Sequence, residues 1–179
     1  EDSFSWNVID LLPFDRSRIE LVTTAAARAA VSRLGPGAAV VVGPGPKDPL
    51  RTGLVEVVRS AAERKLPLLG ICLGCQALGL AFGARLVRAS PVHGKRWGAE
   101  FARSRLFPGV EGPQQVMRYH SLALEQVESP LRLVAATEEG VPMAIEHEQL
   151  PMAGLQFHPD SFATPRGRQM VESFFGAVA

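Results

Sequence analysis

The chain has 179 residues and a formal net charge of +1, with 46% hydrophobic and 21% charged residues. This length suits one domain with a sizeable core, and the near-neutral charge argues against nucleic acid or a membrane surface as the main partner. No apolar run approaches the roughly 18 residues that cross a bilayer. Two cysteines are too few for a disulfide framework, so we expect a reducing compartment, the cytoplasm.

The first half of the chain alternates between helical and extended patterns. Apolar residues at helical spacing indicate the helices, and short apolar or alternating runs bounded by Gly and Pro indicate the strands. In chain order we expect a helix over 1–12, a strand over 17–23, a helix over 24–34, a strand over 38–42, a helix over 50–65, a strand over 66–71 and a helix after Gly74. Such alternation is typical of a parallel sheet covered on both faces.

The second half has shorter and less regular elements. In chain order we expect strands over 84–88, 99–104, 115–119, 131–137, 143–148 and 152–157, a turn over 158–161, and a terminal helix from Thr164 through Phe175. The predicted fold is therefore α/β, an open, mostly parallel twisted sheet with helices on both faces. A small antiparallel part is added to it.

The segment Gly70-Ile-Cys72-Leu-Gly74 lies between the predicted strand over 66–71 and the helix that follows. It has the G-x-nucleophile-x-G form of a sharp strand-to-helix turn, which pushes its middle side chain out over the sheet edge. At a helix N-terminus the macrodipole favours a thiolate over a thiol. Cys72 is therefore the candidate catalytic nucleophile.

Two other interpretations of this segment stay open. Cys72 and Cys75 form a C-x-x-C pair, which in a strand-to-helix setting can be redox-active. Both could also be buried structural cysteines, which is common for free Cys. A zinc site would need a second pair of ligands, and the sequence has no second C-x-x-C and no H-x3-H. We expect neither a metal site nor a cofactor in this chain.

A cysteine nucleophile needs a base and a third group that orients the base. His158 follows the apolar strand predicted over 152–157, so it can reach the carboxyl end of the sheet and face Cys72. Asp160, two residues later, could hold the imidazole through its other nitrogen. Without the cysteine turn, a lone histidine at a strand end would be interpreted as a loop residue.

Acyl transfer also needs N–H donors for the oxyanion. The backbone N–H of Leu73, directly after the candidate nucleophile, is one candidate. The loop Gly43-Pro-Gly45 supplies the other, and because proline has no N–H the candidate there is Gly45. Taken alone, such a loop is typical of a simple turn.

Several segments together resemble the triad-type (class I) glutamine amidotransferase domain. They follow the order of that family and span nearly the whole chain: Asp2-Ser-Phe4, Gly43-Pro-Gly45-Pro46, Gly70-Ile-Cys72-Leu-Gly-Cys-Gln76, His93-Gly-Lys95, Arg118-Tyr-His120-Ser121-Leu122 and Gln156-Phe-His158-Pro-Asp160-Ser161. The His-Gly-Lys and Tyr-His-Ser pieces resemble one branch, the glutaminase partners of chorismate-using synthases. This branch includes the anthranilate, aminodeoxychorismate and phenazine-pathway types.

The resemblance implies hydrolysis of L-glutamine through a thioester at Cys72, with ammonia delivered to a synthase subunit or fused synthase domain. It implies the following roles: Cys72, His158 and Asp160 as the catalytic triad, Gly45 and Leu73 as the oxyanion hole, and Gln76 with the backbone of Ser121 and Leu122 as the substrate-binding positions. It implies no cofactor, and any magnesium would belong to the synthase.

The resemblance also bears on three further histidines. His120 is expected to shape its loop, and His93 is expected near the synthase interface or the ammonia path. His147 lies outside every motif, and we predict a surface histidine there.

The chain departs from the family pattern at three places. Asp160 stands where the family usually has Glu. Because its side chain is one methylene shorter, the orienting hydrogen bond is expected either to come from a shifted backbone or to be longer, with reduced activity. Cys75 stands where the family often has His, and we expect it to pack rather than react. In the family, Asp2-Ser-Phe4 follows a first strand that is missing here, so we expect a piece of a longer polypeptide. The alternative function is a module with a weakened triad that docks to or regulates a synthase.

Overall fold

The structure, a computed structural model, describes residues 4–89 and 94–179. The helices are α1 (Phe4–Leu11), α2 (Thr24–Arg33), α3 (Leu54–Glu63), α4 (Leu73–Ala81) and α5 (Gly167–Val178), with short 3₁₀ helices η1 (Arg16–Arg18) and η2 (Pro49–Arg51). The strands are β1 (Val40–Val42), β2 (Leu68–Ile71), β3 (Arg85–Arg88), β4 (Lys95–Phe101), β5 (Gly112–Arg118), β6 (Leu122–Glu125), β7 (Leu131–Ala136), β8 (Pro142–His147) and β9 (Met152–Leu155).

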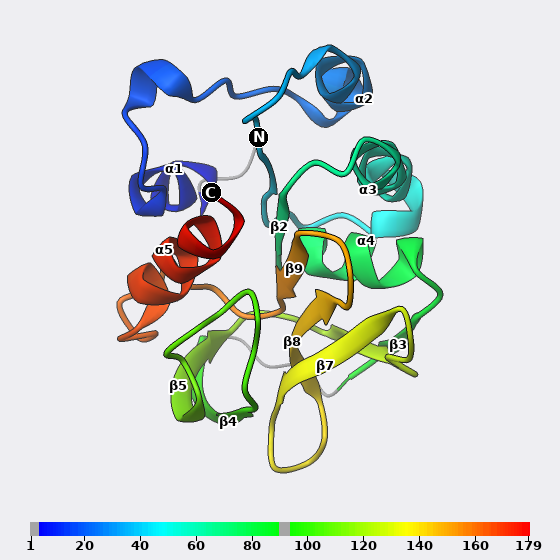
Figure 1. Ribbon diagram of the computed structural model, residues 1–179. Helices are drawn as coiled ribbons and strands as arrows, with labels where there is room; N and C mark the ends of the chain where they lie inside the picture. Colours follow the sequence, from blue (N-terminus) through cyan, green and yellow to red (C-terminus); the bar gives the residue numbers. More distant parts are fainter. Residues whose placement is uncertain (1–3, 90–93) are drawn as a thin grey trace.

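Within the described residues, seven strands form one sheet in the order β1-β2-β9-β8-β7-β4-β5 (Figure 1). The pairs β1–β2 and β2–β9 are parallel, and the pairs from β9 onward are antiparallel. Strands β3 and β6 form a separate two-stranded antiparallel sheet. The predicted α/β fold, with parallel strands and an added antiparallel part, is confirmed.

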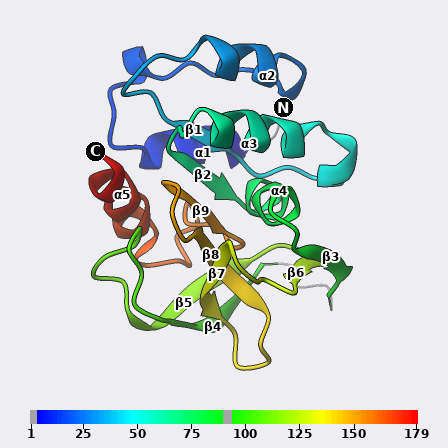
Figure 2. The ribbon, with the colours of Figure 1, turned by 45° about the vertical axis from the view of Figure 1, so that its right-hand side comes forward.

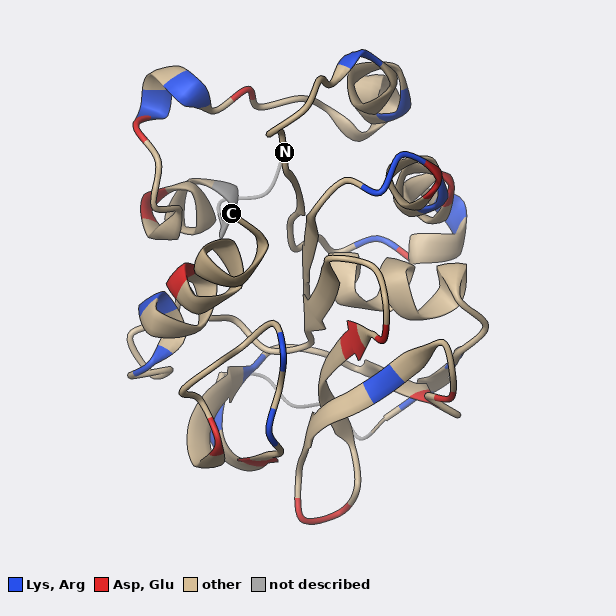
Figure 3. Ribbon diagram, viewed as in Figure 1, with Lys and Arg blue, Asp and Glu red and all other residues tan. Residues whose placement is uncertain are grey.

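Helices cover both faces of the parallel strands, with α2, α3 and α4 on one side and α1 and α5 on the other (Figures 1 and 2). Successive strand residues point to opposite faces. Leu68 of β2 therefore packs with α3 and α4, whereas its neighbour Leu69 packs with α5. Strands β2 and β9 carry no charged residue, in keeping with their burial between helices (Figure 3).

One predicted strand is wrong. Residues 17–23 alternate polar and apolar side chains, but the structure has the 3₁₀ helix η1 and then irregular chain there. Leu21 is 56% exposed. In the described sheet β1 pairs with β2 alone, so this segment is not paired with any described strand. A β pattern without a partner strand cannot satisfy its backbone groups in a ladder.

The other predicted elements are found close to where the sequence places them, with four differences. The helix predicted over 50–65 is divided into η2 and α3, because Gly53 between them is left-handed. The strand predicted over 99–104 is β4, which begins four residues earlier and ends at Phe101. The terminal helix begins at Gly167 rather than at Thr164. Thr164 belongs to the preceding turn, where its Oγ1 atom donates to the carbonyl oxygen of His158 at 2.8 Å. Strand β6 was not predicted from the sequence, and it positions residues 122–125 beside β3.

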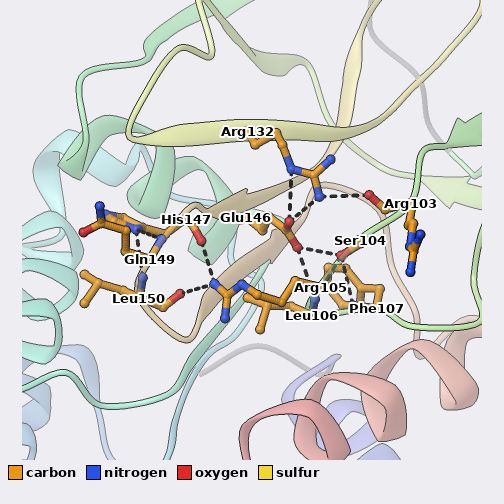
Figure 4. A network of polar contacts seen from close by, with 10 residues as sticks. All are labelled: Arg103, Ser104, Arg105, Leu106, Phe107, Arg132, Glu146, His147, Gln149 and Leu150. Atoms are coloured by element: carbon orange, nitrogen blue, oxygen red, sulfur yellow. Dashed lines mark hydrogen bonds and ion pairs between the residues drawn. The ribbon is translucent and has the colours of Figure 1, made fainter.

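A buried carboxylate holds the loop after β4 against β8 (Figure 4). Glu146 accepts hydrogen bonds from the Ser104 hydroxyl at 2.6 Å and the Leu106 N–H at 3.2 Å, and it pairs with Arg132. Burial raises the pKa of Glu146, but the hydrogen bonds from Ser104, Arg132 and Leu106 outweigh this and lower the pKa below its ordinary value. The network is a stability element rather than part of the cysteine region.

Candidate active site

The cysteine turn has the strained geometry that its glycines predict. Cys72 lies between β2 and α4 with φ 52° and ψ −101°, a conformation that non-glycine residues rarely adopt. A Cβ atom on Gly70 would lie 2.5 Å from the carbonyl of Gly74, and one on Gly74 would lie 2.0 Å from the carbonyl oxygen of Val42. Both positions therefore require glycine, and the strain at Cys72 is stored where packing enforces it.

The backbone around Cys72 is fixed to the neighbouring strand. Its N–H donates to the carbonyl oxygen of Leu155 in β9 at 2.8 Å, and its carbonyl oxygen accepts from the N–H of Gln76 at 3.1 Å. Since β9 leads directly to residues 156–160, the same parallel pairing that holds Cys72 also delivers His158 to it.

His158 lies between Cys72 and Asp160 and is 3% exposed. Burial lowers the pKa of the imidazole, but its interactions with Asp160 and Cys72 outweigh burial and raise the pKa to about 9. The Nδ1 atom lies 3.3 Å from Oδ1 of Asp160, an ion-pair contact rather than an aligned hydrogen bond. The structure thus places His158 in contact with both Cys72 and Asp160, and the contact with Asp160 is long.

Backbone contacts fix the position of His158 from two sides. Its N–H donates to the carbonyl oxygen of Met117 in β5 at 3.0 Å, and its carbonyl oxygen accepts from Thr164. The ring of Tyr119 meets the imidazole edge-on, with centroids 5.2 Å apart. The imidazole is therefore held by its own strand end, by β5 and by the turn before α5.

The two predicted oxyanion residues lie next to one another. A Cβ atom on Gly45 would be 2.8 Å from Cδ2 of Leu73, so the loop after β1 lies directly against the first turn of α4. This is the corner at which Cys72 emerges from β2. Backbone N–H groups at such a corner can stabilise negative charge on an attacked carbonyl oxygen.

Two buried amides lie behind the cysteine. Nε2 of Gln76 donates to the carbonyl oxygen of Leu122 and to Oε1 of Gln156, each at 3.2 Å. Nε2 of Gln156 lies 3.8 Å from the sulfur of Cys72. Sequence reasoning named Gln76 but missed Gln156, although Gln156 opens the Gln-Phe-His segment and is a polar residue after an apolar strand.

The two residues whose backbone is expected to hold substrate, Ser121 and Leu122, lie at the start of β6. Ser121 is exposed, and its carbonyl oxygen accepts from the N–H of Ala89 at 3.0 Å. His120 is buried, and burial together with the charge of Arg118 lowers its pKa to about 4, so the ring is neutral. Its Nδ1 atom lies 2.8 Å from the carbonyl oxygen of Leu122.

Cys75 lies inside α4 and faces β9. It is 1% exposed, and a Cβ atom on Gly154 would lie 2.8 Å from its sulfur. Burial, and then the charge of Cys72, raise the pKa of the Cys75 thiol. Both cysteines are free, and a thiol with a raised pKa is a poor redox partner.

The prediction of a surface histidine at 147 is wrong. His147 is 6% exposed, and its Nδ1 atom accepts from the N–H groups of Gln149 and Leu150 (Figure 4). Its ring meets the ring of Phe82 edge-on. It packs because the turn after β8 folds back over the end of α4. His93 lies outside the described residues.

Two further observations bear on ligands and surroundings. Within residues 4–89 and 94–179, no group of three or more His, Cys, Asp or Glu side chains is arranged to hold a metal ion. No helix in the same residues is long and apolar enough to span a membrane.

Comparison with known proteins gives consistent matches. The family model "Glutamine amidotransferase class-I" matches residues 1–178. The chain is 36% identical to anthranilate synthase component 2 of Azospirillum brasilense over 186 residues, which cover 99% of this chain and 92% of that protein. It is 39% identical over 177 residues to an aminodeoxychorismate synthase of Streptomyces pristinaespiralis, covering 97% of this chain and 25% of that protein.

The fold also resembles a solved structure from Thermoplasma acidophilum, of a protein assigned as a GMP synthase component. The TM-score is 0.77 at 23% identity, covering 88% of this chain and 79% of that one. The chain spans only 19% and 25% of the length of two curated aminodeoxychorismate synthases that it matches.

Proposed function

Because the chain belongs to the class-I glutamine amidotransferase family, we propose that it hydrolyses L-glutamine at Cys72 and supplies the ammonia to a chorismate-using synthase. The observation that carries the proposal is the contact set at one sheet edge: a strained cysteine at a helix N-terminus beside a buried imidazole whose pKa is raised to about 9. A thiolate–imidazolium pair is the form in which cysteine attacks an amide.

The reaction follows from the neighbours of the sulfur. The Cys72 thiolate attacks the side-chain amide carbon of glutamine, and the oxyanion that forms is stabilised by the N–H groups of Gly45 and Leu73. The His158 imidazolium donates its proton to the departing nitrogen, so that ammonia leaves and a glutamyl thioester remains. The neutral imidazole then takes a proton from water, and the hydroxide equivalent attacks the thioester, releasing glutamate and regenerating the thiolate.

Asp160 orients the imidazole and stabilises its positive charge through the 3.3 Å contact. The substrate is held by Gln76 and by the backbone of Ser121 and Leu122, which lie at the start of β6 close to the cysteine turn. No cofactor takes part in these steps. Any magnesium requirement belongs to the synthase.

The test is glutamine-dependent and ammonia-dependent synthesis by the complete synthase assembly. Cys72→Ser should abolish glutamate release while ammonia-dependent synthesis persists. Normal glutamine hydrolysis by Cys72→Ser would refute the proposal. The compartment in which this takes place is proposed to be the cytoplasm, in keeping with two free thiols.

A second candidate function is a module that docks to or regulates a synthase with a weakened triad. The long contact between His158 and Asp160 is the observation that favours it. A thiol-reactive glutamine analogue separates the two functions, because a covalent mass increase mapped to Cys72 requires a working nucleophile. An unmodified Cys72 after prolonged incubation would favour the docking module.

A further inference from the structure

A buried arginine lies at the end of β5, one residue after the strand contact that fixes His158. Arg118 is 3% exposed, and its guanidinium lies over the ring of Trp97 at 4.9 Å from the centroid. Its Nε atom donates to Nε2 of His120 at 3.1 Å. Burying a guanidinium costs more free energy than leaving it in water, and here it donates a hydrogen bond to a neutral histidine. This arrangement therefore needs an explanation.

The contact fixes the tautomer of His120. Arginine keeps its Nε–H at neutral pH, so Nε2 of His120 must be the nitrogen without a proton. The remaining proton of the neutral ring is then on Nδ1, which lies 2.8 Å from the carbonyl oxygen of Leu122 and donates to it. With the other tautomer, the lone pairs of Nδ1 of His120 and of the carbonyl oxygen of Leu122 would face each other at 2.8 Å.

The carbonyl oxygen of Leu122 also accepts from Gln76, which continues to Gln156 and from there to the sulfur of Cys72. A single backbone carbonyl thus receives one hydrogen bond from the arginine side and one from the cysteine side. Its position depends on both donors.

We propose that Arg118 is a positioning residue of the glutamine site, acting through the Nδ1–H tautomer of His120 on the backbone at Leu122. This rests on the proposed function, in which the backbone of Ser121 and Leu122 holds the substrate. Loss of the donor at Nε lets the His120 ring take its other tautomer, and the carbonyl of Leu122 then loses one of its two anchors. The expected consequence is weaker binding of glutamine, with chemistry at Cys72 affected less.

Two substitutions separate the donor from the rest of the side chain. Nε2 of a glutamine side chain is as many bonds from Cα as Nε of arginine, so Arg118→Gln keeps a donor and removes the charge. Arg118→Met keeps the apolar stem and places a methyl group there. In the complete synthase assembly we expect Arg118→Met to raise the KM for glutamine by roughly tenfold, and Arg118→Gln to stay close to the wild type.

Nitrogen-15 NMR of labelled histidine provides a readout that a purely structural role would not move. The wild type and Arg118→Gln should show His120 protonated at Nδ1 alone, and Arg118→Met should show a mixture of tautomers. Equal KM values for the two variants, a fall confined to kcat, or an unchanged tautomer in Arg118→Met would overturn the inference.

A second pair of variants decides the matter if Arg118→Met does not fold. The side-chain amide nitrogen of asparagine occupies the position of Nδ1 of histidine, so His120→Asn should keep a low KM for glutamine. Leucine has nearly the shape of asparagine but no donor, so His120→Leu should raise the KM. Equal KM values for this pair overturn the inference as well. Normal glutamine hydrolysis by Cys72→Ser would instead refute the proposed function, but it would not test the hydrogen bonds between Arg118, His120 and Leu122.

Discussion

The Nδ1 atom of His158 lies 3.3 Å from Oδ1 of Asp160, and both side chains are almost fully buried. An aligned N–H···O hydrogen bond is about 0.3 to 0.4 Å shorter. The carboxylate of Asp160 raises the pKa of the imidazole across this long contact, and a side chain one methylene longer could approach the ring more closely. The activity of the site should accordingly be sensitive to the length and charge of the side chain at position 160.

Asp160→Asn should lower kcat for glutamine hydrolysis on the order of 10²- to 10⁴-fold, because the charge that stabilises the imidazolium is lost. Asp160→Glu is the matched change, since it keeps the charge and adds one methylene that can shorten the contact. We expect its kcat to equal or exceed that of the wild type. Glutamate production measured with the synthase present checks both. A kcat for Asp160→Glu as low as that of Asp160→Asn would contradict the orienting role.

The raised pKa of His158 makes the stability of the protein depend on pH. A folded-state pKa of about 9 against an ordinary 6.5 means that the stabilising contribution is complete below pH 6.5 and is lost as pH rises toward 9. The difference in free energy of unfolding between the wild type and His158→Gln should therefore narrow over this range, by up to roughly 3 kcal/mol. Urea denaturation at several pH values measures it.

The control for this pH dependence is the same comparison in a Cys72→Ala background. Cys72 is one of the two residues that raise the pKa of His158, so the narrowing should be smaller without it. A pH dependence that is unchanged in this background would assign the effect to other groups.

The glycines of the cysteine turn predict a sharp difference between two alanine substitutions. Gly74→Ala brings a methyl group 2.0 Å from the backbone oxygen of Val42, which cannot move without shifting β1, and should cost about 3 kcal/mol or more. At Gly43, one residue after β1, a Cβ atom meets nothing within 4 Å, and Gly43→Ala should change stability by less than about 1 kcal/mol. Thermal unfolding followed by circular dichroism distinguishes them, and equal losses would contradict the close approach.

These glycines also explain which part of the site can be predicted from the sequence. Close backbone approach leaves a visible mark on composition, so Gly70, Cys72 and Gly74 could be identified together. Gln156 leaves no such mark, because its partner is distant along the chain: it contacts Cys72 across 84 positions. Arg118 lies only two residues from its partner His120, but its segment does not show that Trp97 of β4 lies against the guanidinium. Their meaning depends on how β9 and β5 are placed, which no local pattern contains.

The two errors have the same physical origin. Alternation over 17–23 describes the side chains of a strand but says nothing about whether a neighbouring strand is present. His147 has no motif around it, and its burial depends on a turn that folds back over Phe82. Periodicity reports which face of an element is apolar, whereas pairing and burial are decided by the rest of the chain.

Glu146 predicts a separate effect at acid pH. Its lowered pKa means that its stabilising contribution is complete above the ordinary carboxyl value and is lost as pH falls through the folded-state pKa. At pH 7, Glu146→Gln should cost about 1 to 3 kcal/mol, because the buried partners Ser104 and Leu106 keep an acceptor but Arg132 loses its counter-charge. The cost should shrink as the pH falls below 4.5. A cost that is constant with pH would exclude the charge as its cause.

The edge of β1 gives the last prediction. The N–H of Val40 donates to the carbonyl oxygen of Pro67 beside β2 at 2.8 Å, and successive N–H groups along a strand point to opposite sides. The N–H of Val41 therefore points away from β2, to the side on which no strand of the described sheet pairs with β1. Hydrogen exchange should accordingly be fast at Val41 and slow at Val40, which NMR of this chain can measure residue by residue. Equal protection at the two positions would mean that the N–H of Val41 has a hydrogen-bond partner on the far side of β1.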